Sequence, residues 1–159
     1  MRLNFKKLGP LISEVSEKNH DGLVNNLLGI SIEKKFMKSQ ANTIGTDMRK
    51  YKVVKNSQFV YGPVTSRNSD KISISLFRGG QCIVSTSYIV FEINQPDILN
   101  ADYLMLWFSR PEFDRYARYM SHGSAREVFS WEEMCNLYLP IPTLKKQKEI
   151  VKKYKNVIN

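Results

Sequence analysis

The residues of this chain that could support catalysis do not combine into an active site. A metal-dependent nuclease needs clustered carboxylates to hold a cation and orient water. Glu33-Lys34-Lys35 has Glu-x-Lys spacing and Pro96-Asp97 supplies a second carboxylate, but their order along the chain is the reverse of the common nuclease arrangement. An AdoMet-dependent amino-methyltransferase would need a glycine-rich loop after its first strand and an Asn/Asp-Pro-Pro-aromatic tetrapeptide, and the sequence contains neither.

Histidines and cysteines indicate no metal site. His20 and His122 are too far from Cys82 and Cys135 to match a zinc pattern. Both cysteines lie in apolar segments, as packed thiols of reduced intracellular proteins do. The N-terminus lacks an apolar signal core, and the longest apolar run, residues 103–108, is too short to span a bilayer. We therefore expect a non-catalytic, cytoplasmic protein with no metal, no cofactor of its own and no membrane partner.

The charge balance points instead to a polyanionic partner. Twenty-four Lys and Arg residues oppose fifteen Asp and Glu residues in 159, for a net charge of +9. A surplus of this size on a small domain favours nucleic acid over an anionic membrane, although a basic protein without such a partner has the same composition. The 42% hydrophobic content is ordinary for a globular chain with a single core.

Three polar segments carry side chains suited to duplex DNA. Lys and Arg neutralise phosphates, while Arg, Asn, Gln, Ser and Thr read base edges. Solvated loops share this composition, and a Gly after a helix also reads as a C-cap, so neither alternative is excluded by the residues alone. Arg67 and Asn68 are the strongest base-reading candidates because Arg pairs with guanine and Asn with adenine through two hydrogen bonds. The predicted DNA-binding residues are Lys34, Lys35, Lys38, Gln40 and Asn42; Ser66, Arg67, Asn68, Lys71 and Ser73; and Ser124 and Arg126.

The scaffold for these segments is predicted to be mostly strands before residue 100 and mostly helices after it. Residues 72–77 alternate apolar and Ser positions, which is typical of a half-buried strand. Gly79-Gly80 is expected to form a turn, and residues 34–47 a loop with little periodicity. The order of elements predicts an α+β fold. Strands are expected over 24–32, 51–54, 58–61, 72–77, 82–85, 88–93 and 137–141.

Helix starts have recognisable signals. Asn100 is predicted to be an N-cap. Pro111 would break a continuing helix, so a second helix is expected to begin there. Ser130 and Glu133 have the spacing of a capping box for a short helix.

The last segment predicts a basic amphipathic helix. Gln147 occupies one of the heptad core positions, and the others are apolar. A coiled-coil-type helix that packs on a partner and a terminal helix docked on its own domain both explain this stripe. The predicted packing residues are Leu144, Gln147, Val151, Tyr154 and Ile158.

A series of short segments resembles one known family. In order these are residues 51–54 (YKVV), 59–63 (FVYGP), 85–91 (STSYIVF), 103–104 (YL), 123–126 (GSAR), 139–142 (LPIP) and 147–150 (QKEI). The series is similar to a target recognition domain of the specificity subunit of type I restriction–modification systems. The chain departs from the pattern at Lys146, where an acidic residue is usual, and at Pro142-Thr143, where the family has Pro-Pro.

The resemblance implies a curled, mixed β-sheet with flanking helices, followed by the start of a C-terminal coiled-coil-type helix. It implies a DNA target recognition domain over residues 1–142 and a truncated spacer helix over 143–159. The implied partners are double-stranded DNA, the methyltransferase subunit, the restriction subunit, and a second recognition domain or a second copy joined through the helix. AdoMet, ATP and Mg²⁺ are expected on partner subunits.

The resemblance leaves two roles open. The first is a module that reads one half of a bipartite DNA target, and the second is a truncated decoy that acts by occupying the methyltransferase subunit. Full specificity subunits carry two recognition domains, so we expect this chain to be a fragment, a truncated gene product or a half-subunit. Sequence-selective binding to duplex DNA distinguishes the two roles.

Overall fold

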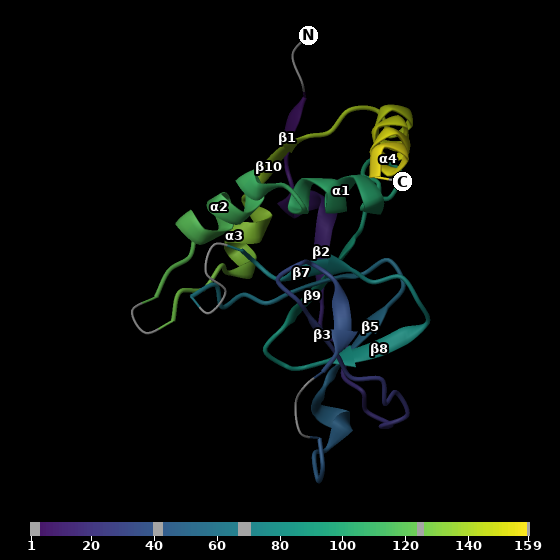
Figure 1. Cartoon of the computed structure of the whole chain (residues 1–159), viewed down its shortest axis with the longest axis vertical. Coiled ribbons are helices and arrows are strands. Elements are labelled where there is room, and N and C mark those ends of the chain that lie inside the picture. The colour runs from purple at the N-terminus through teal and green to yellow at the C-terminus, as the bar shows by residue number, and fades with distance from the viewer. Residues whose placement is uncertain (1–3, 40–42, 67–70, 124–125, 159) are drawn as a thin grey trace.

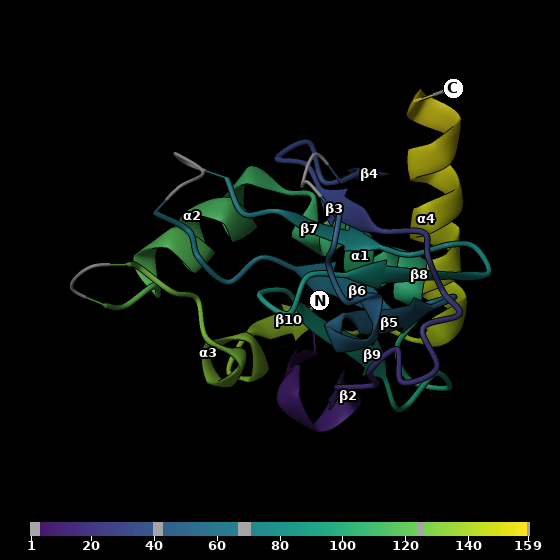
Figure 2. The ribbon, with the colours of Figure 1, turned by 90° about the horizontal axis from the view of Figure 1, so that it is seen from below.

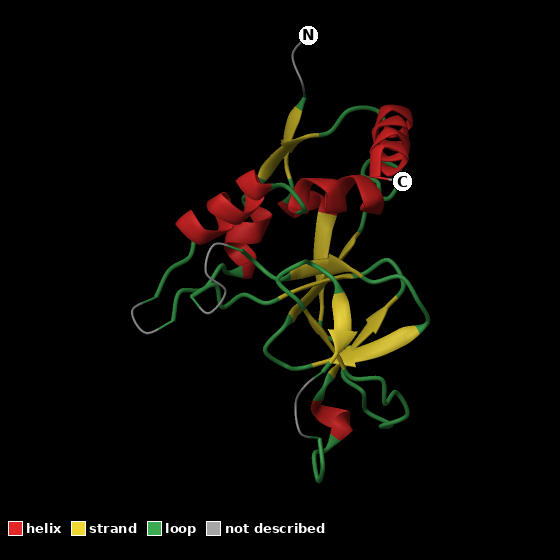
Figure 3. Ribbon diagram, in the orientation of Figure 1, coloured by secondary structure: helices red, strands yellow, loops and turns green. Residues whose placement is uncertain are grey.

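Strands fill the first part of the chain and helices most of the rest (Figures 1 and 3). The computed structural model describes residues 4–39, 43–66, 71–123 and 126–158. Within them the strands are β1 (Phe5–Lys7), β2 (Ile12–Val15), β3 (Leu28–Ile30), β4 (Phe36–Lys38), β5 (Lys52–Lys55), β6 (Phe59–Tyr61), β7 (Ile74–Leu76), β8 (Gln81–Val84), β9 (Ile89–Ile93) and β10 (Tyr138–Pro140). The helices are α1 (Ala101–Phe108), α2 (Pro111–Tyr119), α3 (Trp131–Cys135) and α4 (Leu144–Ile158), with 3-10 turns η1 (Gly9–Leu11) and η2 (Met48–Lys50).

The strands form several small sheets. The largest has the order β2-β9-β6-β7, and β1-β10, β3-β4 and β5-β8 are two-stranded pairs. All of these pairings are antiparallel. The α+β class is therefore confirmed, with the strands distributed over several sheets.

The central strand β6 is buried on both faces, which explains its continuous apolar sequence, and Val90 and Phe91 of its neighbour β9 are buried as well. Phe59 and Phe91 stack with ring centroids 5.0 Å apart in the larger core, which α1, α2 and α3 cover. Val60 and Val90 point the other way into a second core shared with β5 and β8. Alternate side chains of a strand point to opposite faces, so the two cores together bury all three residues of β6.

The helix signals read from the sequence are confirmed. Asn100 Oδ1 accepts a hydrogen bond from the Tyr103 amide at 3.0 Å, α2 begins at Pro111, and Ser130 Oγ accepts from the Glu133 amide at 3.2 Å. Figures 1 and 2 show α2 on the opposite side of the molecule from α4, which lies beside α1. No helix among the described residues is long and apolar enough to cross a membrane.

The C-terminal helix α4 docks on its own domain through a buried polar side chain. Gln147 is 0% exposed; its amide nitrogen donates to the carbonyl oxygens of Ile98 and Pro142 at 2.8 Å, and its oxygen accepts from the Asn100 amide at 2.8 Å. Val151 joins the larger core one turn further on. Gln147 and Val151, two of the five residues of the predicted packing stripe, therefore pack within the domain.

Several predicted elements differ in the structure. The strand expected over 24–32 is limited to β3, and the loop expected over 34–47 contains β4. Strand β4 forms because Phe36 packs edge-on against Phe77, with centroids 5.1 Å apart, a long-range contact that local periodicity cannot reveal. The prediction of a half-buried strand over 72–77 was wrong, because Ser73 and Ser75 are buried as well.

Candidate nucleic-acid interface

The β3–β4 hairpin presents two of the predicted cations to solvent. Its turn is closed by the Ser31 amide donating to the Lys35 carbonyl oxygen at 2.9 Å, and Lys34 adopts a left-handed φ of 65°. Lys35 and Lys38 are exposed on this hairpin. They can reach a phosphate without losing any contact within the domain that the structure records.

Lys34 has a different position from its neighbour. Its ammonium donates to Asp114 Oδ1 at 2.7 Å and to the Phe108 carbonyl oxygen at 2.6 Å, and its side chain is 10% exposed. The ammonium also lies 5.8 Å from the centroid of the Phe113 ring. We therefore leave Lys34 out of the candidate interface, because contacting DNA would break a largely buried ion pair.

Ser73 is also directed inward. It is 5% exposed, and its carbonyl oxygen accepts from the Gly62 amide at 2.9 Å. A Cβ added to Gly62 would lie 2.7 Å from Ser73 Oγ, so Gly62 provides the space that this hydroxyl occupies. Ser73, which directly precedes β7, is thus packed in the interior, and we leave it out of the candidate interface.

The predicted loops that contain Ser66 and Arg126 are hydrogen-bonded to each other through the residues beside them. The Thr65 amide donates to the Glu127 carbonyl oxygen at 2.9 Å, and Thr65 Oγ1 lies 2.7 Å from Ser121 Oγ. Val64 and Val128 form an isolated antiparallel bridge. Ser66, which follows Thr65, and Arg126, which precedes Glu127, are both exposed. The fold therefore brings together two segments that lie 60 residues apart in the sequence.

Gly123 is required by the backbone of its turn rather than by a helix end. Helix α2 ends at Tyr119 with Met120 as its C-cap, so the C-cap reading of Gly123 was wrong. Gly123 has a φ of 133°, and a Cβ built on it would overlap the carbonyl oxygen of Arg126. Only glycine fits this combination of φ and close approach to the Arg126 carbonyl oxygen.

Helix α2 supplies two residues that the sequence analysis missed. Asp114 Oδ1 accepts from the Ile72 amide at 3.1 Å in addition to Lys34. Arg118 Nη1 donates to the Thr65 carbonyl oxygen at 2.9 Å, and its Nε lies 3.5 Å from Glu127 Oε2. The available signal was their spacing: an acidic and a basic residue four positions apart lie on one helix face.

The candidate interface, called the rim below, consists of the exposed residues of these three segments, each of which is bonded to helix α2. Lys71 is exposed directly before Ile72, whose amide Asp114 holds. Gln40, Asn42, Arg67, Asn68 and Ser124 lie outside the described residues, so their predicted role stays a prediction. The described members of the interface are Lys35, Lys38, Ser66, Lys71 and Arg126.

The predicted packing stripe of α4 is divided between the domain and solvent. Gln147 and Val151 face inward, as described above, and Leu144 is half-buried. Tyr154 is 46% exposed and Val157 is 85% exposed. The side chain of Ile158 lies outside the described residues. The helix thus retains an apolar exposed strip at its far end.

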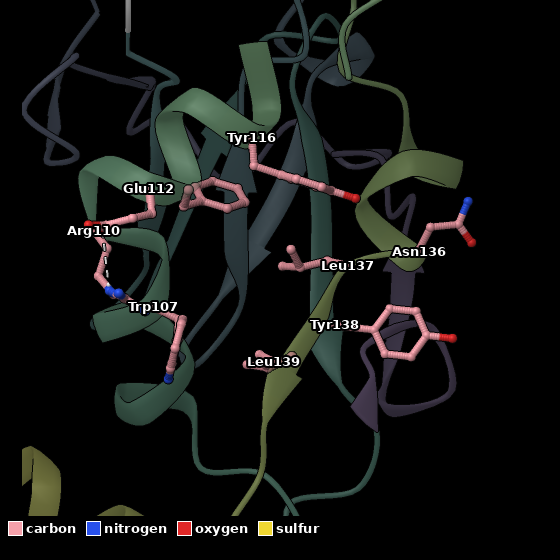
Figure 4. Close-up of a pocket in the computed structure, with 9 residues that line it drawn as sticks. Trp107, Arg110, Glu112, Tyr116, Asn136, Leu137, Tyr138 and Leu139 are labelled. Atoms are coloured by element: carbon pink, nitrogen blue, oxygen red, sulfur yellow. Dashed lines mark ion pairs between the residues drawn. The ribbon is translucent and has the colours of Figure 1, made fainter. Parts of the chain in front are cut away.

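A pocket of about 260 Å³ between α1, α2 and β10 carries aromatic groups rather than catalytic ones (Figure 4). The Arg110 guanidinium lies 4.2 Å from the centroid of the Trp107 ring, and its Nε is 3.4 Å from Glu112 Oε2. Tyr116 and Leu137 form much of the wall. Glu112 is the single carboxylate among the lining residues, so the pocket has no paired carboxylates for acid–base chemistry.

The described residues contain neither a metal-binding cluster nor an activated thiol. No three His, Cys, Asp or Glu side chains among them are grouped to hold a metal ion. Burial raises the pKa of the Cys82 thiol to about 12, and burial also raises the pKa of Cys135. Both thiols are protonated at neutral pH and are therefore poor nucleophiles.

The family of the chain follows from a match to a family model. The model, described as the type I restriction modification DNA specificity domain, matches residues 43–159. This match covers most of the chain, and the protein belongs to this family. Curated proteins include no match to the chain.

Solved structures share the fold at low sequence identity. The chain is similar to a chain from a structure on complex assembly and conformational transition of the type I R-M system (TM-score 0.61, 13% identity, 97% of this chain and 37% of that one). It is similar to the HsdS subunit from Thermoanaerobacter tengcongensis (0.57, 12%, 97% and 37%). It is also similar to the type I restriction–modification S subunit from M. genitalium (0.61, 10%, 96% and 38%). The chain thus spans little more than a third of each of these structures.

Proposed function

We propose that this chain is a DNA-recognition module of a type I restriction–modification specificity subunit. In this role it reads one half of a bipartite target in double-stranded DNA and directs partner adenine-methyltransferase and restriction subunits to that target. The observation that carries the proposal is the family match over residues 43–159. The net charge of +9 supports it, because Lys and Arg that neutralise phosphates supply most of the affinity for a duplex.

The arrangement of the exposed side chains supports a readout of base edges as well as phosphates. Lys35, Lys38 and Lys71 can neutralise phosphates, whereas Arg126 has the planar guanidinium that pairs with guanine. Ser66 lies beside the Arg126 segment because the Thr65 amide bonds to the Glu127 carbonyl oxygen. Positive and hydrogen-bonding groups thus come from three chain segments that are all bonded to helix α2, which supports the proposal.

The proposal assigns the chemistry to partner subunits. The chain itself is proposed to be non-catalytic and cytoplasmic, with AdoMet, ATP and Mg²⁺ bound by its partners. A second recognition domain, or a second copy of this chain joined through α4, is proposed to read the other half of the target. The exposed Tyr154 and Val157 on α4 support an association at that helix.

The test is selection from a randomised duplex DNA pool at low salt, followed by sequencing of the bound fraction. The proposal expects a short enriched motif that is lost in Arg67→Ala and Arg126→Ala. Lys153→Ala removes the same charge from the exposed side of α4 and should retain the motif. With about six phosphate contacts, binding should fall with salt at a log–log slope of about −5. Salt-sensitive binding with no motif in the wild-type protein would contradict the proposal.

A further inference from the structure

Two charged residues of α2 hold both ends of the segment that carries the strongest predicted base-reading residues. Arg118 Nη1 donates to the Thr65 carbonyl oxygen at 2.9 Å. Asp114 Oδ1 accepts from the Ile72 amide at 3.1 Å. Asp114 and Arg118 are four positions apart and therefore lie one above the other on the helix. Thr65 and Ile72, which flank residues 66–71 in the sequence, are thus both bonded to a single helix face.

The same two side chains also hold the other two predicted DNA-contacting segments. Asp114 pairs with Lys34 at 2.7 Å, next to the exposed Lys35 of the β3–β4 hairpin. Arg118 lies 3.5 Å from Glu127, next to the exposed Arg126. All three segments of the candidate interface are therefore bonded to the same turn of α2.

The contacts to the Ile72 amide and the Thr65 carbonyl oxygen fix backbone atoms; Asp114 is largely buried, whereas the Arg118 side chain is 41% exposed. The side chains of Lys34 and Asp114 are 10% and 11% exposed, and the Ile72 amide that Asp114 holds is buried. Charge-assisted hydrogen bonds are short and directional, so they restrict the position of the atoms that they join. Helix α2 is itself held by Phe113 and Ala117, which belong to the larger core.

We propose that Asp114 and Arg118 are positioning residues that set the sequence selectivity of DNA binding. This inference rests on the proposed function. Hydrogen bonds to base edges require donors and acceptors in a defined place, whereas attraction to phosphates depends mainly on the number of cations. Loosening the ends of residues 66–71 should therefore reduce selectivity much more than it reduces affinity for duplexes of arbitrary sequence.

Variants with matched charge changes test the inference in the full chain. Arg118→Gln is compared with Arg115→Gln, an exposed arginine on the same helix whose recorded ion pair is with Glu112 at 3.7 Å. Asp114→Asn is compared with Glu112→Gln, which removes a negative charge from an exposed position in the first turn of α2. Binding of each variant is measured for the selected duplex and for a scrambled duplex at two salt concentrations, below the thermal unfolding temperature of that variant.

The expected result is a loss of discrimination without a loss of phosphate contacts. Arg118→Gln should lower the ratio of the two affinities by about tenfold, the typical effect of misplacing one base contact. Its affinity for the scrambled duplex and its salt slope should equal those of Arg115→Gln. If Arg118→Gln and Arg115→Gln discriminate equally well, the inference is wrong even though the proposed function stands.

Amide hydrogen exchange tests the positioning role of Asp114 and Arg118 in the absence of DNA. In Arg118→Gln the amide of Thr65, which donates to the Glu127 carbonyl oxygen, should exchange about tenfold faster than in Arg115→Gln. In Asp114→Asn the amide of Ile72 should show the same acceleration relative to Glu112→Gln. Equal exchange rates would overturn the positioning role. A wild-type protein that binds DNA without a motif would instead overturn the proposed function and the claim about selectivity with it.

Discussion

Helices α2 and α4 both hold their surroundings through polar side chains, but they do so with different chemistry. On α4 the neutral Gln147 is 0% exposed and makes three hydrogen bonds to the segment around α1's start and to Pro142. On α2 the charged Asp114 is buried beside Lys34 and binds the Ile72 amide, while the partly exposed Arg118 binds the Thr65 carbonyl oxygen. A neutral amide avoids the desolvation cost of a buried charge, whereas the charge of Asp114 is balanced by the ammonium of Lys34 and Arg118 remains in contact with water.

The comparison distinguishes a contact that stabilises the whole fold from contacts that position the exposed segments. Gln147 joins elements that are covered by the core, so its loss should weaken the whole fold. Asp114 and Arg118 join the fold to its rim, so their loss should change the rim first. The following substitutions test this division, beginning with the largest expected change in stability.

Gln147→Leu should have the largest effect on stability. It leaves the Asn100 amide and the carbonyl oxygens of Ile98 and Pro142 without their partner. We expect the free energy of unfolding to fall by about 3 kcal/mol. Urea denaturation measures this, with Lys148→Gln, an exposed position on the same helix, as a control that should change little. A loss below about 1 kcal/mol would show that water replaces these bonds.

Asp114→Asn should cost about 2 kcal/mol, because it leaves the ammonium of Lys34 without a counter-charge in a largely buried place. Adding Lys34→Met should recover part of this loss, since an apolar side chain needs no partner there. The double-mutant cycle, measured by urea denaturation, should therefore give a coupling energy of about 1 kcal/mol or more. Additive effects of the two substitutions would mean that the ion pair does not join the hairpin to α2.

Gly123→Ala should cost about 1.5 kcal/mol, because it places a Cβ against the Arg126 carbonyl oxygen at a φ of 133°. The strain is confined to the rim, so DNA selectivity should fall more than the unfolding temperature does. Gly80→Ala is the matched control: a Cβ there would meet nothing within 4 Å. Equal behaviour of the two variants would contradict the assigned turn geometry.

Asn100→Ala should have the smallest effect of the four, a loss of about 1 kcal/mol, because it removes one N-cap hydrogen bond, to the Tyr103 amide. The Asn100 amide would still donate to Gln147, so the joint between α1 and α4 should persist. Thermal denaturation of the single variant and of the combination with Gln147→Leu measures this. If the single variant is as damaging as Gln147→Leu, the cap rather than the amide joint holds α1.

The local signals in the sequence predicted the helices well. Asn100, Pro111 and Ser130 act at helix starts through bonds or ring geometry that involve near neighbours only. The strands at β5 and β6 were also predicted, over residues 51–54 and 58–61, and in the structure Ser57 adopts a φ of 70° in the turn between them. The α+β class followed from this order of elements.

The contacts that build the rim could not be predicted, because they join residues far apart in the sequence. Lys34 appeared identical to Lys35 as a loop cation, and only its pairing with Asp114, 80 positions away, distinguishes them. Ser73 appeared polar and exposed because the alternation in 72–77 does not reveal a second core behind the strand. The DNA contacts of the exposed residues stay predictions until binding is measured.

Because α2 holds the Thr65 carbonyl oxygen and the Ile72 amide, the ends of the intervening segment are fixed whatever residues lie between them. The chain entropy of closing such a loop grows only with the logarithm of its length, about 0.6 kcal/mol for each doubling. Insertions and exchanges of residues within 66–71 should therefore cost the fold little. The domain is consequently suited to grafting: a new segment can be placed between the same two anchors to change what the rim recognises.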